Sequence, residues 1–163
     1  MRAALLLVPT VWCTVPAAMA QEGQIPPDTK IQLERTTCFG ACPAYSVSID
    51  GQGNVTFEGK NFVRVRGPQT DRIPISKVRG LLETAERIRF FDLRDQYRTI
   101  HNPDGSETMV SDLPTTFVSI RSGGRSKRID DYFGAPKALR DLEREIDLAA
   151  GTKRWVGIDE QAR

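Results

Sequence analysis

Residues 45 to 58 are Tyr45-Ser46-Val47-Ser48-Ile49-Asp50-Gly51-Gln52-Gly53-Asn54-Val55-Thr56-Phe57-Glu58. Apolar and polar residues alternate on both sides of the segment 50–53, with the two-residue period of a strand that has one buried face. The segment between the two runs carries two glycines, which is typical of a turn. This stretch therefore predicts a β-hairpin. The same alternation at Ile31 and Leu33 predicts an earlier strand, in a domain that begins near Lys30.

The segments after the hairpin predict one more strand and a helix. Val63 and Val65 alternate with polar residues and predict a strand that ends at Gly67-Pro68. From Ser76, a suitable N-cap residue, the period changes to that of a helix. Its apolar face consists of Val78, Leu81, Leu82, Ala85 and Ile88.

The last third of the chain predicts a loop, a second hairpin and a second helix. Residues 94–114 are polar and rich in turn formers, and they predict a long surface loop with little regular structure. Residues 116–120 and 125–132 predict the second hairpin. The second helix is expected to open at Pro136 and to stop at Gly151. Its apolar face consists of Leu139, Leu142, Ile146 and Ala149.

The order of these elements, ββββαββα, excludes a regular βαβ alternation. We therefore expect an α+β fold, in which an antiparallel sheet of about six strands has two helices packed on one face. Residues 30–156 form this single domain, preceded by a flexible lead-in over residues 21–29 and followed by a C-terminal tail over residues 157–163. The sequence does not indicate an oligomer, and we expect a monomer.

The N-terminal residues have the pattern of a cleavable export signal. Arg2 is followed by an uncharged apolar run to about Val15, and Ala18-Met19-Ala20 offers the small residues that signal peptidase requires. We expect cleavage after Ala20 and a periplasmic or secreted protein. The run is shorter than the roughly 20 apolar residues of a membrane span, so we expect no membrane-spanning segment after cleavage.

The charge balance argues against an electrostatic partner. The chain has 23 Lys and Arg residues and 21 Asp and Glu residues, and residues 1–20 contain Arg2 and no acid, which leaves 22 against 21. Charges of both signs are interspersed. A nucleic acid or an anionic membrane is therefore not an expected partner.

Cys38-Phe39-Gly40-Ala41-Cys42-Pro43 lies between two predicted strands. In an oxidising compartment two such close thiols usually pair, so a structural disulfide between Cys38 and Cys42 is predicted. The alternative is a thiol-disulfide redox centre, although three residues separate the cysteines here instead of the two of thioredoxin-like motifs. Two cysteines and the distant His101 are a thin ligand set, and we expect no metal and no cofactor.

The chain resembles a family of exported bacterial domains described only as a domain of unknown function. The resemblance rests on Ile31-x-Leu33-x-Arg35 and on Cys38-x-Gly40-x-Cys42-Pro43-x-Tyr45-x-Val47-x-Ile49, then Asp50-Gly51 with Val55 and Phe57. Phe91 with Tyr97, Asp112-Leu113-Pro114, Pro136-x-x-Leu139, Ile146-Asp147 and Arg154-Trp155 extend it over residues 30–156. The resemblance implies a compact α+β domain of the bacterial envelope, and it carries over no catalytic or binding residue.

Two further functional classes follow from the remaining polar and aromatic residues. The loop 94–114 together with Tyr45, Tyr97, His101 and Asp112 is a candidate binding surface, whose ligand would be an envelope protein, a peptide or a cell-wall component. A hydrolase that uses His101 ranks third, behind the redox protein, because the flexible turn around His101 gives poor support for a catalytic geometry. The sequence favours the non-catalytic binding or structural module.

Overall fold

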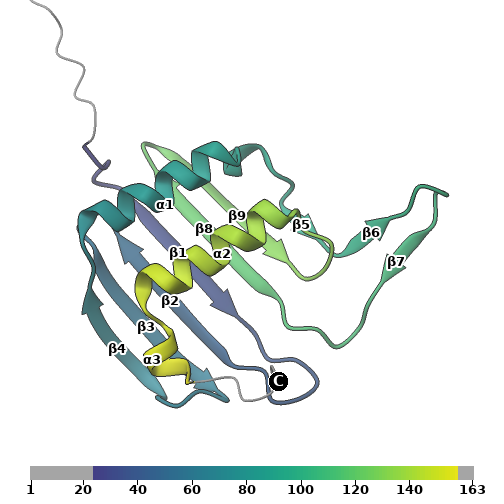
Figure 1. Cartoon of the computed structure of the whole chain (residues 1–163), viewed down its shortest axis with the longest axis horizontal. Helices are drawn as coiled ribbons and strands as arrows, with labels where there is room; N and C mark the ends of the chain where they lie inside the picture. Colours follow the sequence, from purple (N-terminus) through teal and green to yellow (C-terminus); the bar gives the residue numbers. More distant parts are fainter. Residues whose placement is uncertain (1–23, 158–163) are drawn as a thin grey trace, which may run out of the picture.

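The computed structural model describes residues 24–157, which form one main β-sheet with helices against it (Figure 1). The main sheet has seven strands in the order β4-β3-β2-β1-β8-β9-β5. The strand bounds are β1 (Lys30–Arg35), β2 (Ala44–Asp50), β3 (Asn54–Asn61), β4 (Gly67–Arg72), β5 (Gln96–Tyr97), β8 (Thr116–Ser122) and β9 (Arg125–Asp131). β6 (Thr99–His101) and β7 (Glu107–Met109) form a separate pair. The helices are α1 (Ile75–Arg87), the short 3-10 helix η1 (Phe90–Asp92), α2 (Lys137–Ala150) and α3 (Lys153–Val156).

The predicted α+β class and the approximate element order are confirmed. β1, β2, β3, β4, β8 and β9 pair antiparallel, and only the two-residue strand β5 joins the described sheet in parallel, beside β9. The hairpin predicted from residues 45–58 is present, with Val47 opposite Phe57 and Ile49 opposite Val55. The second predicted hairpin is present as β8 and β9.

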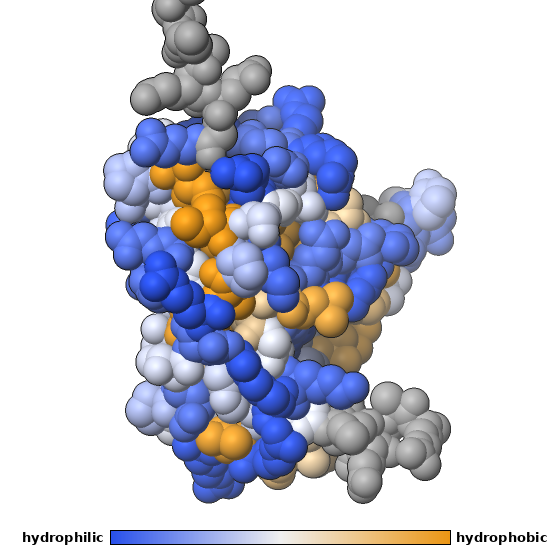
Figure 2. Space-filling model, turned by 60° about the vertical axis from the view of Figure 1, so that its left-hand side comes forward, coloured by the Kyte–Doolittle hydropathy of each residue, from blue (hydrophilic) through white to orange (hydrophobic). Residues whose placement is uncertain are grey.

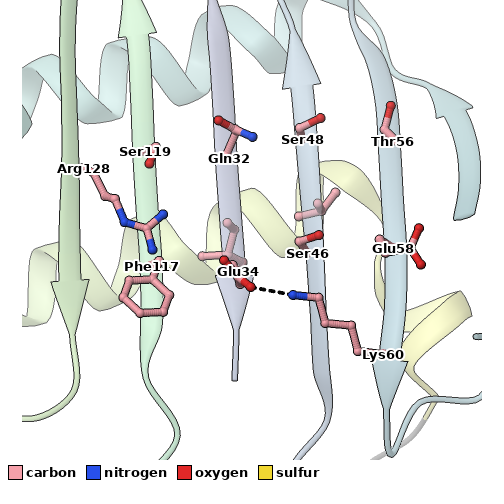
Figure 3. A pocket seen from close by; sticks show the side chains of 12 residues that line it. Gln32, Glu34, Ser46, Ser48, Thr56, Glu58, Lys60, Phe117, Ser119 and Arg128 are labelled. Atoms are coloured by element: carbon pink, nitrogen blue, oxygen red, sulfur yellow. Dashed lines mark hydrogen bonds and ion pairs between the residues drawn. The ribbon is translucent and has the colours of Figure 1, made fainter. Parts of the chain in front are cut away.

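Alternation in the strands divides the sheet into a covered and an open face. Helices α1 and α2 lie across the same face, on which the apolar strand residues are fully buried (Figure 1). Burying one such side chain contributes about 1.5–3 kcal/mol. The alternate residues of the same strands point to the opposite face, which no described helix covers (Figure 3).

Helix α3 closes one end of the core and explains why residues 63–65 are not a strand. The Trp155 ring stacks on Phe57 with centroids 4.9 Å apart. The amides of Arg64 and Val65 donate to the carbonyls of Val156 (3.0 Å) and Trp155 (2.9 Å), instead of to a neighbouring strand. The predicted strand at 63–65 is therefore wrong, and β4 begins at Gly67, where that strand was expected to end.

The helix starts differ from the predicted ones. α1 begins at Ile75 and the residue before it is Pro74, so the prediction of Ser76 as N-cap is wrong. The Pro74 carbonyl accepts a hydrogen bond from the Lys77 amide (2.9 Å), and the fixed φ of proline suits a helix start. α2 begins at Lys137, one residue after the predicted opening. Gly151 ends α2 with φ 67°, as expected for a left-handed terminating glycine.

Residues 94–114 contain more regular structure than predicted, so that expectation is wrong. β5 pairs with β9, and the Tyr97 carbonyl accepts from the Tyr132 amide (3.0 Å). β6 and β7 form a hairpin that projects away from the main sheet (Figure 1). Its turn is held by the Asn102 amide, which donates to the Ser106 carbonyl at 2.8 Å.

The part of the predicted lead-in that the structure describes, residues 24–29, contacts the domain. Both Asp28 carboxylate oxygens accept amide hydrogen bonds at 2.9 Å, from Gly123 and Gly124 in the turn between β8 and β9. The Thr29 hydroxyl bonds that of Ser122 at 2.9 Å. This segment therefore holds the β8–β9 turn. The predicted signal, its cleavage site and most of the tail lie outside the described residues.

The side of the molecule that Figure 2 displays is mainly hydrophilic. Figure 2 shows hydrophobic residues in small patches among hydrophilic ones on the side of the molecule that it displays. Within residues 24–157, no helix combines the length and the apolar character that crossing a bilayer requires.

Candidate functional site

The open face of the sheet carries a row of short polar side chains. The strand register places Gln32 of β1 opposite Ser48 of β2 on one side and Ser119 of β8 on the other. From β4 to β9 the full row is Thr70, Thr56, Ser48, Gln32, Ser119 and Arg128. Neighbouring strands lie about 4.8 Å apart, so the row is about 24 Å long.

Longer side chains beside this row turn it into a groove of about 300 Å³ (Figure 3). Its floor consists of Gln32, Ser46, Ser48, Thr56 and Ser119, and its walls of Glu34, Glu58, Lys60, Phe117 and Arg128. The floor is low because serine and threonine side chains are short. β-strand alternation alone therefore creates the hollow, without an inserted loop.

One wall of the groove is acidic and is crossed by a lysine. Glu34 and Glu58 lie on either side of Ser46 in the register. The register between β2 and β3 shifts at Ala44/Tyr45, which leaves Lys60 without a partner in β2. A bulge of this kind redirects side chains. The Lys60 ammonium reaches across β2 to the Glu34 carboxylate at 2.5 Å (Figure 3).

The other end of the groove has an aromatic ring under a guanidinium. The Arg128 guanidinium carbon lies 4.0 Å from the centroid of the Phe117 ring, a cation–π distance. Arg128 also lies 3.6 Å from Asp130. This stacking holds the arginine across the sheet face at the β9 side of the groove, with Glu34 directly opposite Phe117 in the register and Glu58 two strands further away, on β3.

The floor side chains are available to a ligand. Within residues 24–157, the side chains of Ser46, Ser48, Ser119 and Gln32 make no hydrogen bond to another residue. Each hydroxyl can donate one hydrogen bond and accept two, and the amide of Gln32 can do both. The groove therefore offers alternating donors and acceptors between Glu34, Glu58 and Lys60 on one side and Arg128 on the other.

A second polar cluster is buried between the sheet and α2. The Arg35 guanidinium donates to the Asp147 carboxylate from Nη2 (2.9 Å) and Nε (3.2 Å), and to the Thr116 hydroxyl (3.0 Å). The Tyr45 hydroxyl accepts from Arg35 (3.1 Å) and donates to Asp147 (2.7 Å). Tyr45 is only 4% exposed. Burial, and then the negative charge of Asp147, raise the pKa of Tyr45. Tyr45 is therefore an internal hydrogen-bonding group that belongs to the packed layer.

The same cluster contains a pair of buried carboxyl groups. Burial, and then the charge of Asp131, raise the pKa of Glu143 to about 8. Burial also raises the pKa of Asp131. Arg35 lies 3.9 Å from Glu143 and already holds Asp147, so it offsets this only in part. The Oε1 atom of Glu143 has no hydrogen-bond partner in the described chain. A proton shared between Glu143 and Asp131 is the favourable state at neutral pH.

The Arg35 cluster (Arg35, Tyr45, Thr116, Asp131, Glu143 and Asp147) lacks a metal-site arrangement. In the described part of the chain, no three His, Cys, Asp or Glu side chains are grouped so that they could hold a metal ion. The guanidinium occupies the centre instead. The cluster can hold charge and protons, and it fixes the end of β1 against α2.

A family model described as Domain of unknown function (DUF6438) matches residues 29–150. The chain belongs to this family. A search of curated protein sequences finds no match. The matched DUF6438 span contains the groove, all six residues of the Arg35 cluster and the Cys38–Cys42 segment, and it ends before α3.

In the DUF6438 domain the segment between β1 and β2 is closed by a disulfide between Cys38 and Cys42. The ring presents the Phe39 side chain, which is 90% exposed. The Phe39 amide donates to the Asp112 carbonyl at 3.2 Å, and the Thr36 amide donates to the Thr115 carbonyl at 3.0 Å. The bridge thus shapes a loop that contacts the residues immediately before β8.

We expect the double variant Cys38→Ser/Cys42→Ser to lower the free energy of unfolding by about 2 kcal/mol, because so short a ring removes little entropy from the unfolded chain. Urea denaturation of the wild type and the variant, followed by circular dichroism, measures this difference. The matched control is the wild type treated with reductant, which should lose the same amount. A loss above about 4 kcal/mol would show that the bridge holds more of the fold than its own loop.

The structure does not bring the predicted surface residues together. Tyr45 lies in β2 and Tyr97 in β5, with β1, β8 and β9 between them. Tyr97 is 4% exposed, and its hydroxyl accepts from the Arg94 amide at 3.3 Å. His101 ends β6. Asp112 is exposed with φ 66°, and its carbonyl contacts the disulfide loop through the Phe39 amide.

The groove residues were not singled out from the sequence, although their pattern was visible there. Ser46, Ser48 and Thr56 were used only as the polar half of the alternation that predicted the hairpin. Half of every alternating strand must face away from the core. The unusual shortness of these residues on adjacent strands is the signal that would have indicated a hollow.

Proposed function

We propose that this DUF6438 domain is a non-catalytic binding module of the bacterial cell envelope, and that the groove on its open face binds a peptide. The observation that carries the proposal is the row of unpaired hydroxyl and amide side chains between charged side chains, with Glu58 and the Lys60–Glu34 pair on one side and Arg128 on the other. The export pattern in residues 1–20 and the disulfide support an envelope location.

A peptide suits the groove because its backbone carries N–H and C=O groups in alternation, which neighbouring hydroxyls can bond. Glu58, beside the Lys60–Glu34 ion pair, favours a cationic side chain at one end. Arg128 favours an anionic group at the other. Complementary charges of this kind fix the direction in which a ligand lies more than they add affinity.

The composition of the groove favours binding over catalysis. Its lining includes no histidine and no cysteine. None of its serine hydroxyls is hydrogen-bonded to a base within the described residues, and a nucleophile needs such a partner. The buried carboxyl pair Asp131 and Glu143 is on the covered side of the sheet, and it is not among the lining residues.

We expect Ser48→Tyr to weaken peptide binding at least about tenfold, because the ring fills the middle of the floor. The probe is a capped peptide of alternating lysine, serine and glutamate residues, titrated into the isotope-labelled protein from Gln21 to Arg163. Amide resonances of Ser46, Gln32 and Ser119 should shift on titration. The matched control is Ser76→Tyr, at an exposed position of α1 on the other side of the sheet.

Two results would contradict the proposal. Shifts confined to the helices would place the ligand on the other face. Shifts in the groove with a chitin tetrasaccharide, and none with the peptide, would replace the peptide by a glycan.

A further inference from the structure

The groove continues into a second hollow toward the turn between β8 and β9. This hollow has a volume of about 220 Å³ and shares Gln32, Ser119 and Arg128 with the groove. The residues that it adds on the open face are Lys30, Arg121 and Ser126. We call this hollow, with Lys30, Arg121 and Arg128, the basic end of the groove.

The cationic side chains of the basic end lie on neighbouring strands. The register puts Lys30 of β1 directly opposite Arg121 of β8. Like charges directly opposite in an antiparallel pair are destabilising. Arg128 follows on β9, one row away, opposite Ser119. Three positive side chains therefore share one hollow on three adjacent strands, at a cost that a bound anion would remove.

The acidic residues nearest to this hollow are engaged elsewhere. Asp50, opposite Lys30, accepts hydrogen bonds from the Gln52 and Asn54 amides (2.9 Å each) and from the Asn54 side chain (2.7 Å). Asp28 attracts Arg121, but its two oxygens are bonded to the Gly123 and Gly124 amides.

The third acidic residue near the hollow, Asp130, is shared between two arginines, and Lys30 and Arg121 have no close carboxylate. Asp130 lies 3.6 Å from Arg128 and 3.9 Å from Arg98. Neither Lys30 nor Arg121 has a carboxylate within 4.0 Å among residues 24–157. The positive charge of the hollow is thus only partly compensated by the protein itself.

We propose that the basic end binds a carboxylate of the ligand, in the simplest case the free C-terminus of the peptide. The three cations supply the charge, and the hydroxyls of Ser119 and Ser126 and the amide of Gln32 supply neutral donors beside it. A peptide that lies along the groove then places its cationic group near Glu58 and its carboxylate between Lys30 and Arg121. This inference rests on the proposed peptide-binding function and specifies the direction of the bound peptide.

The test compares two forms of one peptide, acetyl-Lys-Ser-Gly-Ser-Gly-Ser, with a free C-terminal carboxylate or with an amide. We expect the free acid to bind at least about tenfold more tightly than the amide to the protein from Gln21 to Arg163. Lys30→Gln and Arg121→Gln should each reduce this ratio toward one, by weakening the binding of the free acid more than that of the amide form. Arg66→Gln, at an exposed cation outside the groove, is the matched control.

A second readout separates this role from a structural one. Because Lys30 and Arg121 repel each other in the free protein, and no carboxylate of residues 24–157 lies within 4.0 Å of Lys30, Lys30→Gln should leave the melting temperature of the unliganded protein unchanged or raise it. A structural role predicts a lower melting temperature. A variant that loses stability together with the preference for the acid would therefore overturn the proposal.

The possible failures are distinguishable. If neither form of the peptide binds, the peptide-binding function itself is wrong. If both forms bind equally and the variants change nothing, the groove binds peptides but the basic end has no carboxylate site. The last outcome concerns the amide resonances of Lys30 and Arg121. If their shifts saturate at a lower concentration of inorganic phosphate than of the free-acid peptide, the anion is a phosphate and the carboxylate assignment fails.

Discussion

Replacing Arg35 by alanine is expected to lower the free energy of unfolding by about 3 kcal/mol, at the lower end of the range for a broken buried ion pair because the side chain is 26% exposed. The guanidinium is the centre of the buried cluster, with hydrogen bonds to Asp147, Thr116 and Tyr45. Its loss leaves Asp147 without its cation and removes the guanidinium that lies 3.9 Å from Glu143, while Asp131 keeps the attraction of Arg140. The unpaired charges account for most of the expected loss.

Urea denaturation of the variant and the wild type measures this effect. The matched control is Arg144→Ala on the exposed side of α2, which should change stability by no more than about 0.5 kcal/mol. Arg35→Lys should give an intermediate loss, since one ammonium cannot reproduce the fork of donors. A loss below about 1 kcal/mol for Arg35→Ala would mean that water replaces the guanidinium at little cost.

Replacing Glu143 by glutamine is expected to remove most of the pH dependence of stability between about pH 4.5 and about pH 8. Burial and the charge of Asp131 raise the pKa of Glu143 from 4.5 to about 8 in the folded protein. In this interval the folded protein holds a proton that the unfolded chain has released. The folded state binds more protons, so the stability of the wild type falls as the pH rises.

Glutamine cannot ionise, and its amide can donate to Asp131 as a protonated carboxyl would. We expect the variant and the wild type to be similar near about pH 5, and the variant to be the more stable near about pH 8. Carboxylates with a lowered pKa, such as Asp50, titrate below this interval. Glu83→Gln on the exposed side of α1 is the control. Equal slopes for the wild type and Glu143→Gln would show that the folded protein does not hold this proton.

The alternating segments of this sequence were sufficient to predict most of the fold. Tyr45, Val47 and Ile49 are buried and Ser46 and Ser48 face outward, as their two-residue period requires. The helix periods were equally informative because α1 and α2 each bury one face. Elements with a local period were therefore predictable.

The remaining elements depend on partners that are distant in sequence. Residues 63–65 have the period of a strand, but the groups that bond their amides belong to α3. β5 has two residues, too few for any period, and is defined by its parallel pairing with β9. A pattern within the chain carries no information about such pairings.

The candidate site shows the same division. The Cys38–Cys42 bridge was predicted because its two residues are neighbours in an expected oxidising compartment. The contact between Arg35 and Asp147 joins residues 112 positions apart and could not be deduced from spacing. To predict the groove, one must know which face of the sheet α1 and α2 cover. The same serine residues could equally have been covered by a further layer of structure.

The two edges of the main sheet are β4 and β5. Edge strands are the places at which sheets of different molecules join and aggregate. β5 offers two residues, and β4 contains Pro68, which has no N–H to donate, and ends with Asp71 and Arg72. The β4 edge is thus a poor template for an incoming strand, whereas β5 pairs only with Asp130 and Asp131 of β9. A molecule that leaves one sheet face uncovered is therefore protected, at its β4 edge, from the addition of strands from its own copies.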